Sequence, residues 1–270
     1  MKTYKRALSI AGSDPSGGAG LQADLKTFSA LGVYGMTAVV AVVDENTVGV
    51  TGVHPVPVPF VEGQIRSCLD DIGADAVKIG MLHSSELIRA VRDTLAPYNI
   101  PNVVLDPVMV ATSGDALLEA EAVGTLRDEL VPAVAVITPN VPEAEILLGE
   151  KIEAQSQLPD AARELSARGG GVSVLLKAGH LDGDTLTDIF YNGSTGRLTT
   201  LTMPRVETVN THGTGCTLSS AFAAFLAKGA SLDEAARLAK DYIAAAIAAG
   251  AEYKIGHGHG PVNHFHALWK

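Results

Sequence analysis

Short apolar runs alternate with amphipathic segments along most of the chain, and this alternation restricts the fold more than any other feature. The amphipathic segments carry apolar residues at helical spacing. Because the apolar runs are continuous, they indicate strands that are covered on both faces, as in a parallel sheet. The βαβα order predicts an open, doubly wound α/β sheet. The runs are 7–11, 38–43, 76–79, 103–105, 134–137 and 172–176, and the amphipathic segments are 21–31, 60–72, 84–95, 116–130 and 158–167.

The last third of the chain departs from this alternation. Residues 185–205 predict a pair of strands joined by a turn at Asn192-Gly193. Two helices are expected after it, over 216–227 and 232–249. No internal repeat, linker or break in composition is visible, so residues 1–270 are expected to form a single domain.

Composition excludes several classes of function. The 270 residues carry 30 acidic and 20 basic side chains without a basic cluster, which argues against a nucleic-acid partner. The Ala-rich stretch 244–251 is much shorter than the roughly 20 apolar residues that span a bilayer. Only Cys68 and Cys216 occur, and no secretory leader opens the chain, so we expect a cytoplasmic protein without membrane attachment.

A glycine-rich loop, residues 12–20, follows the first strand and leads into a helix. Gly18, Gly20 and Ala23 fit a dinucleotide-binding pattern, and Asp44 lies about 20 residues further on, as that pattern asks. However, six residues separate Ala11 from Gly18, whereas the pattern needs its first glycine directly after the strand. This spacing argues against a nicotinamide-dependent dehydrogenase.

A second glycine turn, residues 210–217, precedes an Ala-rich helix. The backbone N–H groups of such a turn and the positive end of the helix dipole can hold a phosphate. The same field should lower the pKa of Cys216 below its usual value of about 8.5 and make it a better proton acceptor. The alternative is a buried structural cysteine in a tight turn.

Charged side chains follow three other strands, although no P-loop motif is present. Lys177 could reach a nucleotide phosphate, and Asp106 and Glu143 could hold Mg²⁺ directly or through water. Asn140 lies close to Glu143 in the chain. Each could singly be a solvated charge at a strand end, but together they predict a metal and phosphate cluster.

Histidines are concentrated in the C-terminal tail, which suggests a zinc site at first sight. They lie at positions 257, 259, 264 and 266. No cysteine is nearby and the spacing matches no standard zinc motif, so packing and loop closure are the preferred interpretation.

Seven blocks, in order along the chain, resemble the hydroxymethylpyrimidine/phosphomethylpyrimidine kinase family. The resemblance covers nearly the whole chain and implies a ribokinase-like, three-layer α/β/α fold with a mostly parallel central sheet. It also implies ATP and Mg²⁺ as cofactors, a homodimer, and two successive phosphorylations of a pyrimidine in thiamine biosynthesis. The blocks are 11–27, 78–82, 104–109, 137–140, 177–180, 211–216 and 260–264.

The resemblance also assigns roles to residues. Lys177 is implied to contact ATP phosphates, with Asn140 and Thr211 as further nucleotide-binding candidates. The pyrimidine pocket is implied to contain Gly12, Glu45, Met81 and Val108. The anion hole is implied to consist of Gly213, Thr214, Gly215 and Cys216, where most ribokinase-like sugar kinases place an Asp at the position of Cys216.

One position departs from the family pattern. Asp44 adds a second carboxylate next to Glu45, where a small residue is expected. Two carboxylates facing one ligand would repel each other, so Asp44 should point away from the pocket. Two other functions stay open at this point: a vitamin B6 kinase on the same scaffold and a ligand-binding protein without catalytic activity.

Overall fold

A computed structural model describes residues 2–109, 118–179, 181 and 183–269. Within these residues the chain forms one nine-stranded sheet in the order β3-β2-β1-β4-β5-β6-β7-β8-β9. Strands β2, β1, β4, β5, β6 and β7 pair in parallel, whereas β3, β8 and β9 are antiparallel. The strands are Arg6–Gly12 (β1), Tyr34–Glu45 (β2), Val50–Pro55 (β3), Ala76–Ile79 (β4), Val103–Leu105 (β5), Val136–Ile137 (β6), Ser173–Leu176 (β7), Thr185–Asn192 (β8) and Arg197–Pro204 (β9).

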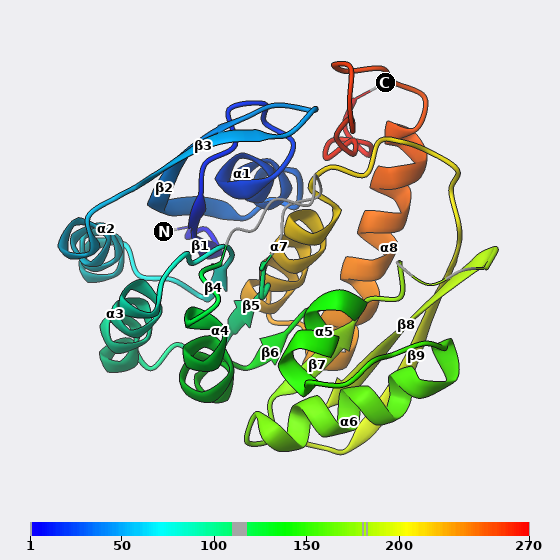
Figure 1. The fold of residues 1–270 in the computed structure, drawn as a ribbon. Helices are drawn as coiled ribbons and strands as arrows, with labels where there is room; N and C mark the ends of the chain where they lie inside the picture. The colour runs from blue at the N-terminus through cyan, green and yellow to red at the C-terminus, as the bar shows by residue number, and fades with distance from the viewer. Residues whose placement is uncertain (1, 110–117, 180, 182, 270) are drawn as a thin grey trace.

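Helices cover both faces of this sheet (Figure 1). Neighbouring residues of a strand point to opposite faces, so Leu8 packs with α2 and α3, while Ala7 belongs to the core beneath α1, α7 and α8. The predicted three-layer, mostly parallel α/β fold is therefore confirmed. The helices are Gly20–Ala30 (α1), Val58–Asp71 (α2), Ser85–Leu95 (α3), Ala122–Thr125 (α4), Val141–Leu148 (α5), Leu158–Arg168 (α6), Thr214–Ala227 (α7) and Leu232–Gly250 (α8).

Three local details differ from the sequence predictions. The expected helix over 116–130 lies partly outside the described residues, and its remainder is the short α4 followed by a π-helical turn, Leu126–Leu130. Strand β3 was not predicted, because most of its side chains are exposed and it lacks an apolar run. Helix α5 was also missed, because its starting residues were interpreted only as a strand exit.

The strand pair at the C-terminal side of the sheet matches its prediction. Strands β8 and β9 form an antiparallel hairpin from the Thr185–Pro204 pair to the Asn192–Arg197 pair. Asn192 begins the turn, and its side-chain oxygen accepts hydrogen bonds from the backbone N–H groups of Ser194 and Thr195.

In the described part of the chain, no helix combines the length and the apolar character that crossing a membrane requires.

Candidate active site

A cavity of about 580 Å³ opens at the carboxyl ends of the parallel strands. This is the edge at which ligands bind in open α/β sheets. All the residues predicted for the site contribute to its wall, although they come from distant parts of the chain. They are Gly12, Glu45, Met81, Asp106, Val108, Asn140, Glu143, Lys177, Thr211, Gly213, Thr214, Gly215 and Cys216.

The two glycine loops meet at the centre of this cavity. Gly213 has φ 77° and begins α7, and a Cβ at this position would overlap the carbonyl of Gly18. Gly20 has φ 52° and begins α1, and a Cβ there would lie 2.6 Å from the oxygen of Gly12. Only glycine adopts these conformations readily and leaves room for the facing backbone. The N-termini of α1 and α7 therefore converge on one point.

Cys216 lies in the first turn of α7, at this point of convergence. The backbone N–H of Gly20 donates a hydrogen bond toward its sulfur. Burial nevertheless raises the pKa of the Cys216 thiol to about 11, and the opposing effect of Lys78 is smaller. The predicted lowering of this pKa is therefore wrong, because loss of hydration outweighs the field of the helix. The thiol carries its proton at neutral pH.

Lys177, Asp106 and Glu143 form a buried charged cluster beside the glycine turn. The ammonium of Lys177 lies 3.0 Å from Oδ1 of Asp106 and 3.9 Å from Oε2 of Glu143. Their side chains are only 14%, 2% and 7% exposed, so they are not solvated charges at strand ends. Thr138 donates a further hydrogen bond of 3.0 Å to Asp106.

The two carboxyl groups of this cluster titrate in opposite directions. Burial, opposed by Lys177 and reinforced by the negative charge of Asp106, raises the pKa of Glu143 to about 7. Burial also disfavours the charged form of Asp106, but Lys177 and Lys78 more than compensate and lower its pKa. Two buried carboxylates that repel each other are suitable ligands for a hard divalent cation.

Asn140 has a structural function that the sequence prediction did not include. Its side-chain oxygen accepts a hydrogen bond of 2.8 Å from the backbone N–H of Glu143, and the Glu143 carboxylate accepts one from the backbone N–H of Asn140. This reciprocal pair is a capping box that begins α5. It also fixes the Glu143 carboxylate beside Lys177.

The four residues predicted to form the pyrimidine pocket, Gly12, Glu45, Met81 and Val108, all line the cavity. A Cβ at Gly12 would lie 2.8 Å from the terminal methyl of Met81, so this side chain packs closely against the end of β1. Glu45 is the last residue of β2 and faces the cavity, whereas Asp44 is exposed and does not line it. The prediction that Asp44 points away is confirmed.

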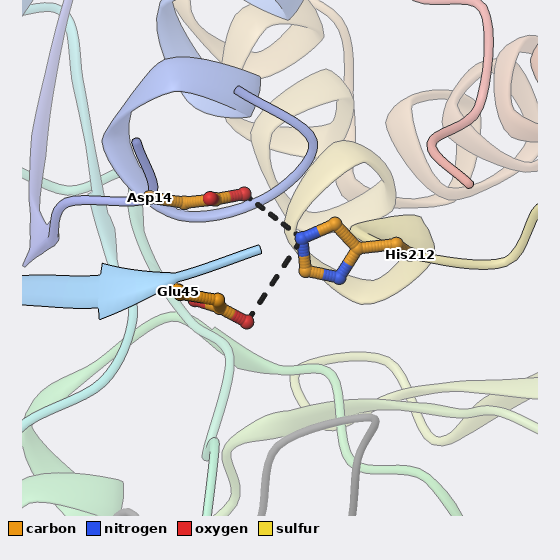
Figure 2. A group of neighbouring side chains, drawn as sticks. All are labelled: Asp14, Glu45 and His212. Atoms are coloured by element: carbon orange, nitrogen blue, oxygen red, sulfur yellow. Dashed lines mark hydrogen bonds and ion pairs between the residues drawn. The ribbon is translucent and has the colours of Figure 1, made fainter. Parts of the chain in front are cut away.

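His212 is a site residue that the sequence analysis missed. Figure 2 shows one nitrogen of its ring facing both Asp14 and Glu45. This nitrogen, Nε2, lies 2.9 Å from Oδ2 of Asp14 and 3.9 Å from Oε1 of Glu45. Burial would lower the pKa of His212, but the hydrogen bond and the charges of its two neighbours raise it overall. The sequence feature that could have identified His212 is its position in the glycine turn, residues 210–217.

Asp14, Glu45 and His212 each have one ligand atom within 4.8 Å of the others, which is close enough to bind a cation. However, the carboxylate of Asp14 already accepts hydrogen bonds from the backbone N–H groups of Ser16, Gly18 and Ala19. We therefore interpret Asp14 and His212 as an ion pair that ties the first glycine loop to the second.

The tail histidines do not gather their rings around a common point in the described residues. The backbone N–H groups of His257 and His259 bind Thr47 and close the tail over the turn after β2. His264 is buried against Thr217, and burial lowers its pKa to about 4. Packing and loop closure thus account for this segment.

An apolar recess beyond Lys177 was also missed. Leu186, Met203, Ile243 and Ile247 line it, and a buried ion pair of 2.6 Å joins Lys240 to Asp188. Its residues come from β8, β9 and α8, so their proximity follows from the tertiary fold.

The fold and this site define a ribokinase-like kinase. A family model described as phosphomethylpyrimidine kinase matches residues 14–263. The chain belongs to the phosphomethylpyrimidine kinase family.

Individual relatives agree with this assignment. The chain is 50% identical over 264 residues to hydroxymethylpyrimidine/phosphomethylpyrimidine kinase of Rhizobium meliloti strain 1021, covering 98% of each protein. It is 47% identical to the thiamine biosynthesis bifunctional protein ThiED of Geobacter sulfurreducens, over 95% of this chain and 51% of that protein. Among solved structures, an ADP complex of Bacillus subtilis pyridoxal kinase is similar with a TM-score of 0.89 and 38% identity, covering 99% of this chain and 100% of the other.

The ion pair of His212 and Asp14 predicts a pH-dependent stability. The pKa of His212 is raised by folding, so its contribution is complete below about pH 6.5 and is lost as the pH rises through the raised pKa. The lowered pKa of Asp14 makes its contribution complete above about pH 4. We expect His212→Gln to reduce the free energy of unfolding by about 2 kcal/mol at pH 6 and by less at pH 9.

Urea unfolding at both pH values measures this difference. The exposed His54, replaced by Gln, is the matched control and should change little at either pH. Equal losses at pH 6 and pH 9 in His212→Gln would show that the ring acts through packing and not through its charge.

Proposed function

We propose that the protein transfers the γ-phosphoryl group of ATP to 4-amino-5-hydroxymethyl-2-methylpyrimidine, and then to the resulting monophosphate, in thiamine biosynthesis. The observation that carries this proposal is the set of groups that one cavity brings together. They are the Glu45 carboxylate, the glycine turn Gly213–Cys216 with Lys177, and the apolar side chains from β8, β9 and α8. Membership of the family supports the same activity. The whole chain, 1–270, acts as one kinase domain.

The pyrimidine binds at the end formed by Gly12, Glu45, Met81 and Val108. The Glu45 carboxylate accepts a hydrogen bond from the exocyclic amino group, while Met81 and Val108 contact the ring. This arrangement places the hydroxymethyl group toward the glycine turn that begins α7.

The phosphoryl group in transfer is held by the backbone N–H groups of Thr214, Gly215 and Cys216, at the positive end of α7. Negative charge spreads over its oxygens in the transition state, and a nearby ammonium stabilises that charge. Lys177 supplies this ammonium, because its Nζ would lie only 3.4 Å from a Cβ at Gly215.

ATP occupies the remainder of the cavity, with its base in the apolar recess and its phosphates toward Lys177. Thr211 and Asn140 are further contacts to the nucleotide. Asp106 and Glu143 would hold Mg²⁺, since the cation relieves the repulsion between their buried carboxylates. When bound, this ion supplies neutralisation of phosphate charge.

The alcohol substrate must lose a proton when its oxygen attacks. In this step the new O–P bond forms, the bond from the γ-phosphorus to the ADP oxygen breaks, and the proton passes to the sulfur of Cys216 in its thiolate form. The monophosphate needs no base, because its second pKa is about 6 and it is largely dianionic at neutral pH.

A vitamin B6 kinase is the second candidate, because a pyridoxal kinase has a closely similar fold. Activity toward the alcohol, its monophosphate and pyridoxal, each with ATP and Mg²⁺, distinguishes the two. Turnover of pyridoxal alone would overturn the proposal.

We place the activity in the cytoplasm, where the thiols of Cys68 and Cys216 would stay reduced. A homodimer stays a prediction.

Glu45→Gln tests how the pyrimidine is recognised. The amide can donate a hydrogen bond where the carboxylate only accepts, so we expect the preference for the pyrimidine over pyridoxal to fall about tenfold. The ratio of kcat/KM for the two substrates measures it. Asp44→Asn is the matched control, because this neighbouring carboxylate is exposed. An unchanged ratio in Glu45→Gln would mean that Glu45 does not recognise the pyrimidine ring.

Lys177→Ala tests transition-state stabilisation. We expect kcat to fall by about 10²–10³-fold with a smaller change in KM for ATP, because the charge appears mainly in the transition state. Lys151→Ala removes an exposed lysine that does not line the cavity and should leave both constants unchanged. A raised KM with an unchanged kcat would limit Lys177 to nucleotide binding.

Cys216→Ala separates the two phosphorylations. With a thiol pKa of about 11, thiolate increases about tenfold for each pH unit, so kcat for the alcohol should rise similarly from pH 6 to 9. The variant should lose this slope and about 10²–10⁴-fold in rate with the alcohol, but little with the monophosphate. Steady-state rates with each substrate measure both effects. Equal losses with both substrates would make Cys216 a part of the anion hole alone.

A further inference from the structure

A second lysine, Lys78, lies buried in the wall of the cavity. It is on β4, and its ammonium lies 2.9 Å from both carboxylate oxygens of Asp24 on α1. Both side chains are fully buried. Burying such a pair is costly, so its position at the active site needs an explanation beyond stability.

The Asp24 carboxylate is held from two further elements. Ser9 on β1 donates a hydrogen bond of 2.5 Å to it, and Ser220 on α7 donates one of 2.6 Å. Ser220 follows Cys216 by four residues, so the two side chains lie on the same face of α7. The ion pair is therefore fixed one helical turn below the cysteine.

The chain leaves space for the ammonium beside the cavity. A Cβ at Gly80 would lie 2.9 Å from Nζ of Lys78 and 3.0 Å from the Cβ of Ala11. Glycine at this position thus keeps the end of the lysine unobstructed. Lys78 and Cys216 both line the cavity.

Lys78 differs from the other two lysines that line the cavity, Lys177 and Lys240. Lys177 is partly exposed and is assigned above to the phosphates of ATP. Lys240 lies at the apolar recess with Asp188. Lys78 is fully buried behind the cysteine and is paired through both oxygens of one carboxylate.

Several charged groups of the described residues act on the sulfur of Cys216. They are Lys78, Asp24, Asp106 and Lys177. The ammonium of Lys78 affects the thiol more strongly than the carboxylate of Asp24 does. The pair therefore acts on the sulfur as a net positive influence.

We propose that Lys78 is a positioning residue for phosphorylation of the alcohol, a permanent cation that Asp24 holds behind Cys216 and that favours the thiolate form of this side chain. This inference rests on the proposed function, in which the thiolate accepts the proton of the alcohol. It explains what favours the charged form of a thiol whose pKa is raised by burial.

The experiment follows the titration of Cys216 directly, without turnover. In a Cys68→Ser background, Cys216 is the only cysteine, and its alkylation by iodoacetamide is followed from pH 7 to 10.5. We expect Lys78→Met with Asp24→Asn, which removes both charges together, to lower the alkylation rate at pH 8.5 about tenfold, because less thiolate is present. The pair Lys240→Met with Asp188→Asn is the matched control and should leave the alkylation profile unchanged.

Asp24→Asn alone gives a result of opposite sign. It removes the opposing carboxylate while Asp106 still favours the charged form of Lys78, so alkylation at pH 8.5 should become faster than in the parent. A purely structural role would not produce opposite changes in the two variants. This single variant also keeps the proposal testable if the double variant does not fold, with circular dichroism checking the fold of each.

An alkylation profile that is unchanged in folded variants, or that shifts in the same direction in both, overturns the proposal. Slower alkylation in the double variant together with a lower kcat for the alcohol supports it fully. Slower alkylation with an unchanged kcat for the alcohol would show that Lys78 acts on the thiol but has no role in phosphorylation of the alcohol, which overturns the proposal. That result would also overturn the base role of Cys216 in the proposed function, whereas an unchanged alkylation profile overturns only the action of Lys78, so the two failures are distinguishable.

Discussion

The close contact between two glycine turns is the constraint on which the site depends. Gly213 lies against the carbonyl of Gly18, and this contact brings the N-termini of α1 and α7 to one point. The partial positive charges of both helix ends then act on the same small volume. A side chain at either glycine would separate the loops, and the proposed anion hole would lose its shape even if the sheet stayed intact.

Charges are placed around this point in a definite arrangement. Two serines in succession on α7 each contact a buried carboxylate that is paired with a lysine: Ser220 binds Asp24, and Ser219 lies 3.4 Å from Asp106. The first turns of α7 are thereby held from both sides by ion pairs. Because each pair has hydroxyl partners as well, the buried charges remain hydrogen-bonded and their cost is reduced.

Local sequence patterns predicted much of the fold and less of the site. The continuous apolar runs identified the parallel strands, because a strand that is covered on both faces of the sheet needs apolar side chains on both faces. The capped helix from Leu232 to Gly250 also matched, because Ser231 accepts a hydrogen bond from the backbone N–H of Glu234. Strand β3 was missed, because a largely exposed edge strand carries no apolar run.

The site required information that is distant in the chain. The partner of His212 is Asp14, which precedes it by 198 residues, and the partner of Lys78 precedes it by 54. No local spacing indicates such pairs. The sign of the Cys216 titration was wrong for a related reason, because the helix field is visible in the sequence but the depth of burial is not.

In the proposed function, Lys177 and Lys78 serve the two phosphate acceptors, the alcohol and its monophosphate, in different ways. Lys177 is partly exposed and can exchange its carboxylate partners for phosphate oxygens, so it can serve both acceptors. Lys78 is enclosed and keeps Asp24, so its influence stays directed at the sulfur. Only the alcohol needs a proton acceptor, since the monophosphate is already ionised. One anion hole can therefore serve both reactions. Lys78 would contribute to phosphorylation of the alcohol alone, and Lys177 to both phosphorylations.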